Sequence, residues 1–67
     1  MDQRLERLFE FREEYQMEVD KALKVQLLKQ MRVEIERFLK ENNLHMTAWD
    51  FLHATSEAYL QWRRNKH

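Results

Sequence analysis

The stretch "ALKVQLL" (residues 22–28) decides the fold, because two local structures compete for it. Three apolar residues alternate there with Lys24 and Gln26, which is the period of a half-buried β-strand. The alternation is short, and Ala, Leu, Lys and Gln are better helix formers than strand formers. We therefore favour a helix over this stretch and keep a strand as the alternative.

The apolar residues on the two sides of this stretch follow different helical faces. With an advance of about 100° per residue, apolar residues from Leu5 to Leu23 gather around one direction. Those from Leu27 to Leu39 gather on nearly the opposite side. One straight helix with one buried face cannot produce this pattern, so we expect a break or a change of packing partner between Leu23 and Leu28. One subunit would then leave an apolar face uncovered, which favours a dimer or a higher oligomer.

The clearest local signals surround "ENNLHMTAWDF" (residues 41–51). Asn43 can adopt the left-handed conformation that ends a helix. Thr47 has the position of an N-cap, and Asp50 can reach back toward it as in a capping box. Met46 and Phe51 have the spacing of a hydrophobic staple. A helix is therefore predicted to begin at about Thr47.

These patterns predict an all-α fold, a small helical hairpin or a three-helix domain assembled as a dimer. We expect helices near 2–22, 25–42 and 47–64, of which the first two could be continuous through a kink. The absence of glycine and proline supports the helical class. A ribbon-helix-helix dimer with a short strand at 22–28 is the alternative. The chain of 67 residues is expected to form a single domain, 1–67.

Composition limits how so short a chain can be stabilised. Cysteine is absent, so disulfides and thiolate metal sites are excluded, and self-association is the expected stabiliser. Net charge is zero, but residues 1–20 carry −4, residues 21–41 carry +3 and residues 42–67 carry +1. No apolar run approaches the ~20 residues that span a bilayer, and the first residues lack the apolar stretch of a signal peptide. We expect a cytoplasmic protein without membrane attachment.

Residues 24–60 resemble the ribbon-helix-helix family of DNA-binding regulators. Asn43 stands where the family commonly has glycine, and Leu44 and Thr47 match its turn and cap. "AYL" (residues 58–60) is similar to a segment of its second helix. Two departures are a leucine at position 28, where the family commonly has proline, and the absence of a net positive charge.

The resemblance implies a dimer whose two short strands pair and enter the major groove of DNA. Lys24 and Gln26 would then read base edges, since lysine donates to guanine and glutamine can pair with adenine. Backbone amides near Thr47 would bind a phosphate. Nucleic acid is therefore a possible partner under the alternative interpretation.

The favoured function is a protein–protein interaction module that self-associates, such as an adaptor, an inhibitor or a regulatory subunit. The candidate residues for self-association or partner contact are the apolar positions of the first helix: Leu5, Leu8, Phe9, Phe11, Tyr15 and Val19. No enzyme is expected, because no recognisable nucleophile–base set or phosphate-binding glycine loop is present. No cofactor or metal is expected either. Asp50, His53 and Glu57 share a helical face, but a solvated face explains them better than a metal site.

Overall fold

Residues 2–66 are described by a computed structural model, in which they form four α-helices and no strand. The helices are α1 (Gln3–Met17), α2 (Lys21–Glu41), α3 (Ala48–Ala54) and α4 (Ser56–Lys66). The all-α class is thereby confirmed. Residues 22–28 lie inside α2, so the helical interpretation of this stretch is confirmed and the alternative strand is wrong there.

Two acidic side chains build the turn between α1 and α2. A carboxylate oxygen of Glu18 accepts hydrogen bonds from the backbone N–H groups of Val19 at 3.1 Å and Asp20 at 3.0 Å. Asp20 is the N-cap of α2, and its carboxylate accepts from the amides of Ala22 at 2.9 Å and Leu23 at 3.2 Å. These bonds satisfy amides that an interrupted helix would otherwise leave without partners.

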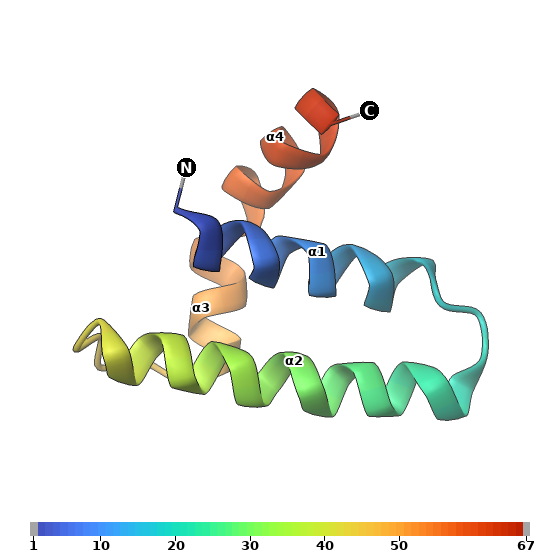
Figure 1. The fold of residues 1–67 in the computed structure, drawn as a ribbon, viewed down its shortest axis with the longest axis horizontal. Helices are drawn as coiled ribbons and strands as arrows, with labels where there is room; N and C mark the ends of the chain where they lie inside the picture. The colour runs from blue at the N-terminus through green and yellow to red at the C-terminus, as the bar shows by residue number, and fades with distance from the viewer. Residues whose placement is uncertain (1, 67) are drawn as a thin grey trace.

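The chain reverses direction at this turn, so that α1 and α2 lie side by side and antiparallel (Figure 1). The helix expected over 2–22 ends at Met17, and the helix expected over 25–42 begins at Lys21. The break therefore lies upstream of residues 22–28. Because the chain folds back, the two apolar faces pack on each other within one subunit, and the change of face does not by itself require a second one.

The end of α2 follows the expected asparagine signal. Asn43 adopts a φ of 55°, the left-handed conformation. The amide of Leu44 donates to the carbonyl of Leu39 at 2.9 Å, and the amide of Asn43 donates to the carbonyl of Lys40 at 3.2 Å. This pair of bonds is the Schellman motif, which satisfies carbonyls at a helix end.

The predicted cap of the third helix is also confirmed. Thr47 is the N-cap of α3, and its hydroxyl oxygen accepts a hydrogen bond from the amide of Asp50 at 3.1 Å. The chain thus turns at a fixed point after α2, which places α3 across the α1–α2 hairpin near the first residues of α1 (Figure 1).

The helix expected over 47–64 is divided at Thr55. The hydroxyl of Thr55 donates to the carbonyl of Phe51 at 2.7 Å, and that of Ser56 donates to the carbonyl of Leu52 at 2.8 Å. Hydroxyls that bond back to carbonyls one turn earlier bend helices. The bend sends α4 away from α3 at an angle, so that α4 packs against α1 and rises steeply from it (Figure 1).

Two apolar clusters hold these helices together. The first lies between α1, α2 and α3, and its buried members are Leu8, Met31, Ile35, Leu39, Ala48 and Phe51. The second, the aromatic cluster, joins α1 to α4 through Phe9, Tyr59 and Trp62. The partly buried Leu5 packs against both clusters. Helix α1 therefore lies between α2 on one side and α4 on another.

A membrane-spanning helix is not found in residues 2–66, where every helix is too short or too polar to cross a bilayer.

Candidate interaction surface

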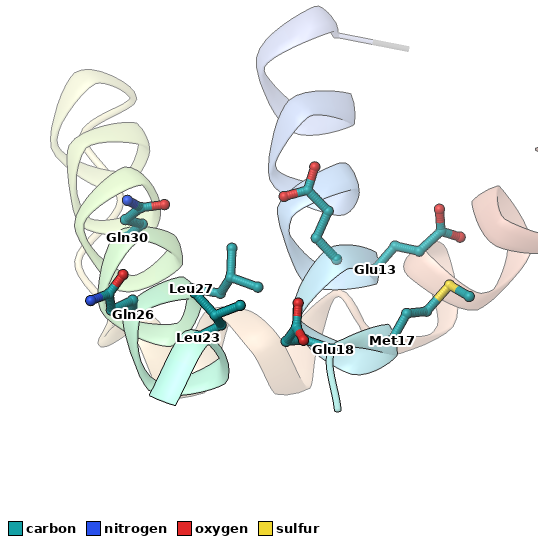
Figure 2. Close-up of a pocket in the computed structure, with 8 residues that line it drawn as sticks. Glu13, Met17, Glu18, Leu23, Gln26, Leu27 and Gln30 are labelled. Carbon is teal, nitrogen blue, oxygen red and sulfur yellow. The ribbon is translucent and has the colours of Figure 1, made fainter. Parts of the chain in front are cut away.

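The α1–α2 hairpin carries a run of shallow hollows that α3 and α4 do not line. One hollow, of about 460 Å³, lies beside the turn between the helices and is shown in Figure 2. Its lining residues are Glu13, Glu14, Met17, Glu18, Leu23, Gln26, Leu27 and Gln30. In Figure 2, Leu23 and Leu27 point from α2 toward α1, and Gln26 and Gln30 stand on α2 beside them.

Three further hollows continue along the same hairpin. The middle one, of about 450 Å³, is lined by Phe11, Lys29, Gln30, Val33 and Glu34. Another, of about 520 Å³, follows α1 and is lined by Gln3, Glu6, Arg7, Glu10, Phe11 and Glu14. The last, of about 210 Å³, lies near the start of α1 and is lined by Arg4, Arg7, Leu8, Glu34, Arg37, Phe38 and Glu41.

Shared residues make these hollows one continuous surface, which we call the open face. Glu14 and Gln30 line the hollow at the turn and a neighbouring hollow. Phe11 lines the middle hollow and the hollow that follows α1, which we call the two central hollows. Arg7 lines the hollow that follows α1 and the hollow near the start of α1. Met17, Leu23 and Val33 are the most exposed apolar side chains on this face, at 65%, 50% and 55%. Exposed apolar side chains in contiguous hollows are typical of an interaction surface.

Charge changes along the open face. The turn end has three glutamates in its hollow and no basic residue. At the other end, Arg4 pairs with Glu41 at 2.6 Å and Arg37 pairs with Glu34 at 3.5 Å. Arg7 remains without an ion pair there among residues 2–66, and its guanidinium lies 5.9 Å from the centre of the Phe11 ring. The face is therefore acidic at the turn, and its other end carries arginines and glutamates in equal number.

The opposite side of α1 is closed by α4 around a half-buried arginine. The Arg12 guanidinium donates to the hydroxyls of Thr55 at 3.3 Å and Ser56 at 3.1 Å, where α3 bends into α4. It also lies 4.6 Å from the centre of the Tyr59 ring. Burial lowers the pKa of Arg12, and Tyr59 acts in the opposite direction. Arg12 thus fixes α1 to the bend by hydrogen bonds and a cation–π contact.

Tyr59 is the most deeply placed polar side chain of this closed side. Its residue is 1% exposed, and its hydroxyl makes no hydrogen bond of standard geometry within residues 2–66. Burial raises the pKa of Tyr59, Glu13 also raises it, and Arg63 and Arg12 oppose the change. Arg63 and Lys66 approach Glu13 at 3.8 Å and 3.9 Å, which ties the end of α4 to α1.

The six predicted contact residues of the first helix separate into three groups. Leu8 and Phe9 are buried inside the chain, so they stabilise the fold and offer no surface in this conformation. Leu5, Phe11 and Tyr15 are partly buried. Val19 was expected on the helix, but it lies in the turn and is 93% exposed. Of the six, Phe11 lines two hollows of the open face, and the buried Leu8 lines the hollow near the start of α1.

The residues of the DNA-binding alternative do not form a paired strand. Lys24 and Gln26 both lie on α2, and Lys24 places its ammonium group 4.9 Å from the centre of the Tyr15 ring. Two residues apart on a helix, they point in different directions. Thr47 caps α3, a helix of seven residues. The strand-based mode of reading DNA therefore lacks its structural element in residues 2–66.

Asp50, His53 and Glu57 are all exposed, and no group of three potential metal ligands occurs within residues 2–66. His67, which has no predicted role, lies outside the described residues.

Sequence reasoning missed the contribution of α2 to the open face and the role of Arg12. The pattern did contain a signal for Arg12, because it occupies an apolar position in the 3-4 spacing of Leu8, Arg12 and Tyr15. A long charged residue at such a position indicates a buried stem with a specific partner for its head group. For Gln30 and Val33 no local pattern separates an interface from a solvated face.

No protein-family model matches the chain. Neither the curated proteins nor the solved structures contain a significant match.

Proposed function

We propose that this chain is a protein–protein interaction module that self-associates through the open face of the α1–α2 hairpin. The observation that supports the proposal most is the unbroken run of hollows along α1 and α2, none of which is lined by α3 or α4. A second hairpin packed there would complete a four-helix bundle, the common arrangement for amphipathic helices of this length.

The size of the chain supports the same proposal. A domain of 67 residues has a small core, and its two clusters leave Leu23 and Val33 half exposed. Small domains without disulfides commonly gain stability from oligomerisation. Burial of these side chains would contribute about 25 cal/mol for each Å² of apolar surface removed from water.

Phe11 provides the test, because it lies midway along α1 and lines both central hollows. We expect Phe11→Asp to convert a dimer into a monomer, since it places a charge in the middle of the apolar contact. Sedimentation equilibrium measures the mass, which should fall from twice 8.5 kDa to 8.5 kDa.

Leu60→Asp is the matched control. Leu60 is an exposed apolar residue on α4, outside the open face, and its replacement should leave the mass unchanged. Circular dichroism checks that both variants keep their helices. A wild-type chain that stays monomeric at high micromolar concentration would refute the proposal, and so would a dimer that Phe11→Asp leaves intact.

A further inference from the structure

We propose that the occupant of the open face is a second copy of this chain packed with its ends reversed, so that the turn end of each copy meets the start of α1 in the other. The inference rests on the proposed self-association and adds its geometry. A face-to-face pair related by a two-fold axis has two arrangements, because the axis can run along the hairpin or across it. The charges on the open face distinguish them.

In the like-ended arrangement, the axis runs along the hairpin and α1 lies over α2 of the other copy. Residues that line the same hollow lie at about the same position along the hairpin, and we call them level. Arg7 shares the hollow near the start of α1 with Glu34 and Arg37, so it would face these two residues of the other copy. Arg7 would approach a pair whose charges already neutralise each other at 3.5 Å. Glu14 would meet Gln26 and Gln30, which are uncharged. Lys29 of the other copy would lie level with Phe11, between Glu10 and Glu14, so this arrangement gains one kind of attractive contact but leaves Arg7 without one.

In the reversed arrangement, the axis crosses the hairpin and α1 lies on α1 of the other copy, antiparallel. Phe11 lies near the axis because it is central on α1, and it meets its own copy. Arg7 and Glu14 lie on opposite sides of Phe11 at nearly equal sequence separation, so each Arg7 comes level with the Glu14 of the other copy. Neither side chain has an ion-pair partner within residues 2–66, so each is available.

Helix α2 gives a second, weaker pair. The middle hollow places Lys29, Gln30, Val33 and Glu34 level with Phe11, so the axis passes between Gln30 and Val33. The reversed arrangement then brings Lys29 level with Glu34 of the other copy, which already pairs with Arg37 of its own chain at 3.5 Å. Arg7 and Glu14 therefore supply the main attraction, and Phe11, Glu10 and Val33 lie nearest the centre. Such complementarity fixes register and suppresses wrong partners.

Charge reversal tests the pairing between Arg7 and Glu14. Arg7→Glu alone gives two Glu–Glu contacts per dimer, and Glu14→Arg alone gives two Arg–Arg contacts. Each variant should dimerise about tenfold more weakly than the wild type at low salt. A mixture of the two has an attractive pair at both contacts, so a mixed dimer should form with wild-type affinity. Arg64→Glu, an exposed change on α4, is the control that should alter nothing.

Cysteine cross-linking tests the arrangement itself, because the natural chain has no cysteine. A mixture of Arg7→Cys and Glu14→Cys should form an intermolecular disulfide much faster than either variant alone, since a disulfide needs Cα atoms within about 7 Å. A mixture of Arg7→Cys and Glu34→Cys should couple slowly. The opposite result would establish the like-ended arrangement and overturn this one.

The two proposals fail in different ways. A monomeric wild-type chain refutes self-association and this inference together. A dimer that Phe11→Asp dissociates, but whose charge-reversed variants show no mutual rescue, retains the proposed function and overturns the reversed pairing. Wild-type dimerisation that is insensitive to salt between 20 and 500 mM, about a fivefold change in Debye length, would also overturn it.

Discussion

The two sides of α1 use similar residue types to different ends. The side toward α4 is closed, with the Phe9 ring 5.7 Å from Tyr59 and 5.8 Å from Trp62, and with Arg12 hydrogen-bonded at the helix bend. The open side also has an aromatic ring and an arginine, Phe11 and Arg7, which lie 5.9 Å apart and line a shared hollow. The same pair of residue types therefore stabilises the fold on one side and remains available on the other.

The largest expected change in stability comes from removing the Phe9 ring on the closed side. Phe9→Ala should lower the free energy of unfolding by about 3–5 kcal/mol, because Phe9 is only 1% exposed and leaves a cavity in the aromatic cluster. Val19→Ala, in the exposed turn, should change it by no more than about 0.5 kcal/mol. Urea denaturation at one fixed protein concentration measures both. Phe9→Leu gives a milder cavity if the alanine variant does not fold, and equal costs for Phe9 and Val19 would contradict the comparison.

Replacing Arg12 and Arg7 separately compares what the closed and the open side of α1 contribute to stability. Arg12→Met should cost about 1–3 kcal/mol, since it leaves the Thr55 and Ser56 hydroxyls without their donor and removes the charge above Tyr59. Arg7→Met should leave the stability of the subunit nearly unchanged. Chemical denaturation of a Phe11→Asp background removes any contribution from self-association. Similar losses of unfolding free energy in the two variants would show that Arg7 also stabilises the subunit, which would contradict the comparison.

The smallest expected effect is the response of the closed side to alkaline pH. Folding raises the pKa of Tyr59 above its ordinary value of 10.0, so the folded state holds the proton more tightly than the unfolded state. This contribution is complete below pH 10 and is lost as pH rises through the folded pKa. Stability should therefore fall as the pH rises above 10, and less so in Tyr59→Phe. Denaturation at several pH values measures it, and an identical decline in both proteins would contradict the assignment.

The parts of the fold that local chemistry specifies were predictable from the sequence. Asn43 and Thr47 ended and began helices as expected, because a left-handed residue and a hydroxyl cap act within a few residues of themselves. Residues 22–28 followed their helix propensity. The turn at Asp20 was missed because aspartate is also tolerated within helices, and only its bonds to Ala22 and Leu23 identify it as a cap.

The bend at Thr55 and the candidate surface depended on contacts between distant residues. The local pattern is the same whether Thr55 bends the helix or is an ordinary helical residue. The distinguishing contact comes from Arg12, which is distant in the sequence. Phe9 and Phe11 were assigned to the same face, although two residues apart on a helix they point roughly 160° from one another. Which of the two is buried by α4 was decided by the direction of that helix after the bend.

The central claim is that the open side of the hairpin, and not the closed side, is where two copies meet. Backbone amide spectra recorded at a low and a high protein concentration test it most directly. We predict concentration-dependent shifts at Phe11, Gln30 and Val33, with Tyr59 and Trp62 unchanged. Shifts confined to α4, or spectra that do not depend on concentration, would contradict it.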